Sequence, residues 1–178
     1  DHLVNGAGFC VALGAPDPAT GRPLIASLLS SVLNDADQYP LNEFLRGDHE
    51  TTCEQGCYRC LLRYRNQPYH GLLDWRLGLA FLDAFANASS RCGLGGNFGT
   101  PALREWGALV ERDVWRLERQ FTRMQTRQVG SLWAARFDGS PKWALIAHPL
   151  WDASEPTGVL LDAVTALGND PFVIVDSF

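Results

Sequence analysis

The sequence predicts an α+β fold in two parts. A mainly helical subdomain is expected over residues 1–92, followed over residues 93–178 by a small α/β unit with the order helix, hairpin, helix, strand. Apolar residues recur at three- and four-residue spacing in the first part, whereas β-type apolar runs follow residue 130. A glycine-rich stretch over residues 93–101 separates the two patterns, and we place the boundary there.

Three helices are expected from periodicity and capping signals. The first covers residues 24–34, where six apolar side chains share one helical face: Leu24, Ile25, Leu28, Leu29, Val32 and Leu33. The second covers residues 72–85 and is apolar on nearly every side, which predicts burial all round, with Asp74 favouring its N-terminus. The third and longest runs from residue 101 to 127, with Thr100 as N-cap and Pro101 in its first turn.

The long helix is expected to have two faces. Its apolar stripe is Val110, Val114, Leu117, Phe121 and Met124. Its opposite face carries five arginines, Arg112, Arg116, Arg119, Arg123 and Arg127. Beyond Gly130, strands are expected at residues 131–137, 143–148 and 172–176, with a helix over residues 158–167.

Composition limits the classes of partner. The formal net charge of −5 excludes a general polycation, but fourteen of the fifteen basic residues are arginines, which suit phosphate recognition and ring stacking. No apolar run approaches the roughly 20 residues that cross a bilayer, and the start lacks a signal-peptide pattern. We therefore expect a cytoplasmic protein without a membrane partner. Because the chain begins at Asp1 and stops inside a β-type run, we expect it to be part of a longer polypeptide.

The chemistry of the chain is concentrated in the pattern His49-x3-Cys53-x3-Cys57-x2-Cys60. A Cys-x2-Cys step lets two thiolates meet one ion across a tight turn, for which Gly56 supplies backbone freedom. Two more ligands within the preceding eight residues complete a tetrahedron. The pattern predicts a structural Zn2+ site, with Arg59, Arg63 and Arg65 close enough in sequence to offset its negative charge.

Other interpretations of the cysteines are weaker. The fourth ligand is expected to be His49, with Cys10, Cys92 and His70 as alternatives. A redox Cys-x2-Cys pair would sit at a helix start after a strand and would not need Cys53. A zinc deaminase needs His-x-Glu and Pro-Cys-x2-Cys, neither of which is present.

The segment from Cys57 to Arg76 resembles a known family. It reads Cys57-Tyr58-Arg59-Cys60-Leu61-Leu62-Arg63-Tyr64-Arg65-Asn66 and continues through His70 to Leu73-Asp74-Trp75-Arg76. It is similar to the zinc-binding C-terminal domain of MrfA-type DEAD/DEAH-box superfamily 2 helicases and of the DISARM anti-phage protein DrmB. Residues 5–9 and 148–151 resemble further segments of that family. Many members have four cysteines where this cluster has three, and the chain carries no ATPase motif.

The resemblance implies a non-catalytic accessory domain that helps a helicase motor or its partner subunit engage DNA during repair or phage defence. The expected DNA-binding residues are those near the metal, Arg59, Arg63 and Arg65, and those on the long helix, Arg112, Arg116, Arg119 and Arg123. One alternative is a scaffold that docks a partner protein. A second is a degenerate nuclease-like unit using Asp138 and Lys142, although no Glu-x-Lys follows on the next strand.

Overall fold

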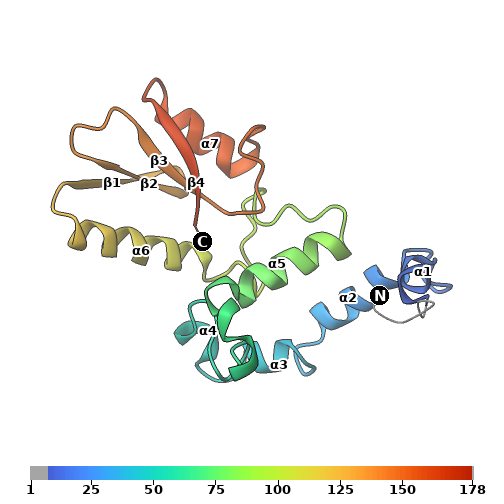
Figure 1. The fold of residues 1–178 in the computed structure, drawn as a ribbon. Helices are drawn as coiled ribbons and strands as arrows, with labels where there is room; N and C mark the ends of the chain where they lie inside the picture. Colours follow the sequence, from blue (N-terminus) through green and yellow to red (C-terminus); the bar gives the residue numbers. More distant parts are fainter. Residues whose placement is uncertain (1–7, 178) are drawn as a thin grey trace. The chain divides into compact units, whose positions relative to one another are not determined.

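A computed structural model of the chain describes residues 8–177 and confirms the α+β class. The chain forms two compact units, Asp1–Ser90 and Arg91–Phe178 (Figure 1). This division falls two residues before the expected boundary, and the glycine-rich stretch belongs to the second unit. Of residues 5–9, which were compared with a segment of the resembling family, residues 5–7 lie outside the described part.

The first unit is helical. Its elements are α1 (Phe9–Gly14), α2 (Leu24–Asn34), α3 (Leu41–Phe44), α4 (His49–Thr52), the 3-10 helix η1 (Tyr64–Leu72) and α5 (Trp75–Ala86). The bounds predicted for α2 are confirmed, and α2 packs against α5. Helix α5 begins at Trp75 because the Asp74 carboxylate accepts a hydrogen bond from the Leu77 amide at 2.8 Å.

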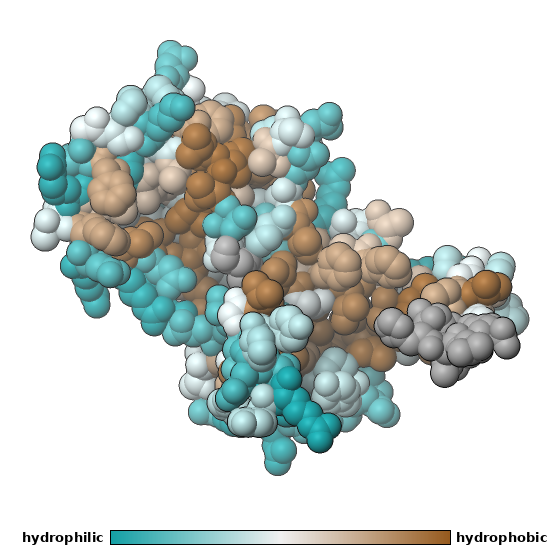
Figure 2. Space-filling model, in the orientation of Figure 1, coloured by the Kyte–Doolittle hydropathy of each residue, from teal (hydrophilic) through white to brown (hydrophobic). Residues whose placement is uncertain are grey.

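Helix α5 is not buried all round, so that expectation is wrong. It buries one side, which includes Trp75 and Leu79, whereas Phe81 and Phe85 are exposed and stack on each other with ring centroids 6.4 Å apart. Figure 2 shows apolar side chains at the surface over α2 and α5. An apolar helix tends to be buried, but burial of every face requires neighbouring elements on every side. The first unit covers only one side of α5.

The second unit contains one four-stranded sheet. Its elements are α6 (Trp106–Gln120), β1 (Met124–Val129), β2 (Leu132–Phe137), β3 (Trp143–Ala147), α7 (Gly158–Leu167) and β4 (Phe172–Asp176). The strand order is β1-β2-β3-β4: the first three are antiparallel, and β4 runs parallel to β3 after the crossover through α7 (Figure 1). The predicted hairpin, helix and last strand are therefore confirmed.

The expected long helix over residues 101–127 is wrong at both ends. Helix α6 starts at Trp106 and ends at Gln120, where Phe121 turns extended, and residues 124–129 form β1. The pairing of β1 with β2, from Met124 with Phe137 to Val129 with Leu132, outweighs the helical spacing of the side chains. Arg123 and Arg127 consequently leave the helix.

The core of the second unit lies between the sheet and its helices, and its fully buried side chains include Val114, Leu132, Leu145 and Leu160. The glycine-rich stretch is bonded to this core, because the Val159 amide donates to the Leu94 carbonyl at 2.9 Å. A Cβ atom on Gly158, which has a φ of +51°, would overlap that carbonyl. None of the helices in the described part of the chain is both long and apolar enough to cross a membrane.

Candidate metal centre

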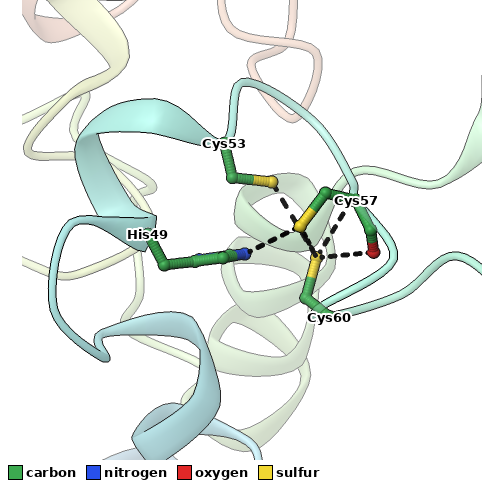
Figure 3. A group of neighbouring side chains, drawn as sticks. All are labelled: His49, Cys53, Cys57 and Cys60. Carbon is green, nitrogen blue, oxygen red and sulfur yellow. Dashed lines mark hydrogen bonds between the residues drawn. The ribbon is translucent and has the colours of Figure 1, made fainter.

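Four side chains of the first unit converge on one point. The ligand atoms of His49, Cys53, Cys57 and Cys60 all lie within 4.8 Å of one another (Figure 3). Cys60 Sγ is 3.8 Å from Cys57 Sγ and 3.9 Å from Cys53 Sγ, and His49 Nε2 is 3.4 Å from Cys57 Sγ. A tetrahedral zinc ion with Zn–S bonds of about 2.3 Å places its sulfur ligands about 3.8 Å apart. The donor set therefore fits such an ion.

Two local structures position the ligands. Helix α4 carries His49, and the Cys53 amide bonds to the His49 carbonyl at 2.9 Å, so both side chains project from the same face of one helical turn. Cys57 and Cys60 lie on a tight turn in which the Cys60 amide donates to the Cys57 carbonyl at 3.0 Å. The Cys57 amide donates in turn to Cys60 Sγ at 3.2 Å. Such amide bonds stabilise a thiolate that ligates a metal.

The orientation of the His49 ring is fixed by the backbone. Nδ1 lies 2.9 Å from the Phe44 carbonyl oxygen, which can only accept, so the ring proton is on Nδ1. The lone pair of Nε2 then faces the three sulfurs, as a metal ligand requires. The ring is buried and packs against Trp75, with centroids 5.8 Å apart.

The thiols differ in acidity. Burial raises the pKa of Cys53 far above its usual range, and the neighbouring Cys60 charge adds to this effect. Burial also opposes ionisation of Cys57, but hydrogen bonds from the Arg59 backbone and from the neighbouring thiols of Cys53 and Cys60 lower its pKa below the usual value. Cys57 therefore ionises more readily than Cys53. Cys53 needs a cation beside it to ionise, so metal binding here is expected to release protons.

Arg76 is the residue of the site that sequence reasoning missed. Its side chain is only 2% exposed, and Nη1 donates to the carbonyls of Cys53 and Glu54 at 2.8 Å each, while Nη2 donates to that of Glu50. These bonds satisfy the buried guanidinium and hold the backbone that carries Cys53. The nearest sequence signal was its place at the start of α5, directly after a large apolar residue.

The arginines that were expected to offset the negative charge of the metal site lie at the surface. Arg59 pairs with the exposed Asp48 at 3.3 Å. Arg63 donates to the carbonyls of Tyr58 and Leu62 at 3.2 and 2.7 Å. Both side chains remain largely in solvent, as does Arg65.

Helix α5 also bonds directly to the metal-binding loop. The Trp75 indole donates to the Cys53 carbonyl at 3.3 Å, and the Trp75 amide donates to the Gln55 carbonyl at 3.0 Å. A Cβ atom on Gly56 would lie 2.9 Å from the Leu73 carbonyl oxygen. Gly56 is not among the glycines with positive φ, so the loop requires glycine there for close approach and not for backbone freedom.

The alternative fourth ligands are placed elsewhere. His70 Nε2 lies 3.0 Å from both the Arg63 carbonyl oxygen and Asn66 Oδ1. Asn66 Nδ2 donates to the Leu61 carbonyl at 3.0 Å, so these two side chains hold the loop's own backbone. Cys10 is exposed on α1, and Cys92 is buried in the second unit. Within residues 8–177, His49 is the histidine that joins the three cysteines.

The remaining sequence-predicted residues lie in the second unit. On α6, Arg112, Arg116 and Arg119 alternate with three acidic residues, and Arg116 pairs with Asp113 at 3.0 Å. Arg123 lies in the turn after the helix. Asp138 accepts a hydrogen bond from Gln125 at 2.6 Å, and neither it nor Lys142 belongs to the metal-ligand cluster found within residues 8–177.

No protein-family model, no curated protein and no solved structure matches the chain.

Proposed function

We propose that the chain is a zinc-stabilised, non-catalytic domain that engages nucleic acid. The observation that supports this most strongly is the closed set of four donors, His49, Cys53, Cys57 and Cys60. Three thiolates and one imidazole in a tetrahedral arrangement favour zinc over harder cations. Four protein ligands leave no coordination position for water or substrate, which favours a structural role over a catalytic one.

The loop around the metal provides the nucleic-acid surface. Residues 55–73 contain three arginines, Arg59, Arg63 and Arg65, and no aspartate or glutamate, although the whole chain has a net charge of −5. A local excess of exposed guanidinium groups attracts phosphates even when the whole protein is acidic. The arginines of α6 are a weaker second surface, because three acidic residues on the same helix balance them.

The biological setting follows from the resemblance to the MrfA and DrmB zinc-binding domain. We propose that the chain serves a helicase system of DNA repair or anti-phage defence, with a motor domain or partner subunit supplying ATP hydrolysis. The supporting residues are the cysteine cluster and the segment from Cys57 to Arg76. In the structure this segment forms the metal loop, η1 and the start of α5.

Two measurements test the proposal. Elemental analysis of the purified chain should find one zinc per polypeptide. Affinity for a labelled DNA should fall steeply as salt rises, because phosphate contacts release counterions. Arg63→Gln with Arg65→Gln should reduce the salt dependence, whereas Arg116→Glu with Arg123→Glu should have the smaller effect. Undetectable DNA affinity at low ionic strength would reject nucleic-acid engagement.

A protein-docking scaffold is the second candidate function. The exposed, stacked pair Phe81 and Phe85 on α5 favours it, because large aromatic side chains are enriched in protein interfaces. In that case Phe81→Ser with Phe85→Ser should abolish co-purification of a helicase motor and leave DNA affinity unchanged.

A further inference from the structure

We infer that the metal loop and η1 form a stacking platform for single-stranded nucleic acid, on which Tyr64 and Tyr69 hold unpaired bases and Arg63 and Arg65 contact the phosphates. This inference rests on the proposed function and specifies that the nucleic acid bound is single-stranded. It excludes duplex DNA as the preferred partner of this face.

Three of the chain's four tyrosines, all of which are exposed, lie in this segment. Tyr58, Tyr64 and Tyr69 have 65%, 82% and 60% of their surface in solvent, within a segment of twelve residues. Packing within the unit does not account for side chains left this open. An exposed aromatic ring offers a face on which any base can stack, and base–aromatic stacking is the sequence-tolerant interaction of single-strand binders.

The segment that carries these rings is held in place before any ligand arrives. Tyr58 contacts His70 edge-on with centroids 5.7 Å apart, and His70 bonds to Asn66 and to the Arg63 carbonyl. The Arg63 amide in turn donates to Asn66 Oδ1 at 2.7 Å. A preordered surface loses less conformational entropy on binding than a mobile loop does.

Positive charge beside the rings favours a single strand over a duplex. Arg63 and Arg65 alternate with Tyr64 along the chain and are exposed, so cations and rings occur together. Arg63 Nη1 bonds to the Tyr58 and Leu62 carbonyls, which holds this side chain beside the loop. Arg59 is already paired with Asp48, and a phosphate would have to displace that carboxylate. A duplex can use the arginines but not the rings, because its bases are stacked on each other. A single strand uses both.

The test compares fluorescence anisotropy of labelled oligo-dT with that of a labelled duplex, using the whole chain loaded with zinc. Tyr64→Ala with Tyr69→Ala should weaken oligo-dT binding by roughly 30-fold or more, as expected for two stacking contacts, and should leave duplex binding and the salt slope unchanged. Tyr64→Phe with Tyr69→Phe keeps both rings and should bind as the wild type does. Phe85→Ala removes an exposed ring outside this face and is the matched control.

The salt dependence of oligo-dT affinity tests the role of the arginines. Arg63→Gln with Arg65→Gln should reduce the salt slope for oligo-dT by roughly 1.4, corresponding to two lost phosphate contacts on a single strand. Zinc content and the unfolding midpoint of each variant establish that the loop is intact. Together the two pairs of variants separate stacking from charge.

Each outcome decides between distinct hypotheses. The stacking platform is refuted if the alanine pair binds oligo-dT as tightly as the wild type does. It is also refuted if the affinities for oligo-dT and for the duplex fall equally. In either case nucleic-acid engagement stands. If the wild type binds neither ligand at low salt, the proposed function fails and the platform fails with it. Selective loss of oligo-dT, with rescue by phenylalanine, supports the platform.

Discussion

Arg76 Nη1 donates a hydrogen bond to the backbone carbonyl of Cys53 at 2.8 Å, which joins the first turn of α5 to a metal ligand 23 residues earlier in the chain. The same guanidinium bonds to the carbonyls of Glu54 and Glu50. These three acceptors belong to α4 and to the two residues that follow it, where carbonyls lack partners within a helix. One buried cation thus joins α4, the metal loop and α5.

Arg76→Met should therefore destabilise the first unit strongly. The substitution keeps an apolar stem but leaves three carbonyl acceptors without their donor, which we expect to cost about 2 to 4 kcal/mol. Denaturant unfolding monitored by hydrogen exchange of the α5 amides measures this loss. Arg65→Met, at an exposed arginine, is the control and should change stability by no more than about 0.5 kcal/mol. Equal effects of the two variants would contradict the role assigned to Arg76.

Gly56→Ala should loosen the metal loop. The added methyl would lie 2.9 Å from the Leu73 carbonyl oxygen, so the loop must move away from the start of α5. We expect a cost of about 1 to 3 kcal/mol and a weaker affinity for zinc, measured by competition with a chromogenic chelator. Gly71→Ala is the matched control, since a Cβ atom there meets nothing within 4 Å. Unchanged zinc affinity in the Gly56 variant would show that the close approach is dispensable.

The cluster and several elements could be predicted because their signals are local. His49, Cys53, Cys57 and Cys60 lie within twelve residues, so short-range spacing alone brings the four side chains near one ion. Helix α2 and strands β2, β3 and β4 likewise follow from side-chain periodicity. For these segments local preference and tertiary structure agree.

The features that could not be predicted depend on distant contacts. Arg76 reaches carbonyls more than twenty residues away, and no spacing rule encodes such a contact. Strand β1 continues the apolar spacing of α6 through Met124, so periodicity extends the helix, and only pairing with β2 reveals the strand. The role of Gly56 was misassigned for the same reason, because the carbonyl it approaches belongs to Leu73.

The second unit should lose stability in acid through His148. Burial lowers the pKa of its imidazole to about 4, from 6.5 in an exposed histidine, and the ring packs against both Trp106 and Trp151. The unfolded chain therefore binds a proton that the folded chain excludes between these two pH values. The stabilisation is complete above pH 6.5 and is lost as pH falls towards 4, by at most about 3 kcal/mol.

The test of this pH dependence is a comparison of His148→Gln with the wild type. Hydrogen exchange of the β3 amides, measured from pH 7 to pH 4, should show a smaller loss of stability in the variant over that window. An NMR titration of the His148 ring should give a midpoint well below 6. A midpoint near 6.5 would mean that the ring is solvated when it ionises.

Removal of the metal should unfold the first unit and spare the second. All four ligands belong to residues 49–60, and a structural zinc site contributes roughly 10 to 16 kcal/mol of apparent binding free energy, comparable to the whole stability of a domain. Cys57→Ser should therefore abolish stoichiometric zinc binding and hydrogen-exchange protection in α4 and α5. The amides of β2 and β3 should keep their protection, because the sheet has its own core around Leu132 and Leu145. Cys10→Ser, at an exposed cysteine outside the cluster, is the control and should retain one zinc per chain. If the α5 amides of the Cys57 variant stay protected after chelation, packing alone holds the first unit together.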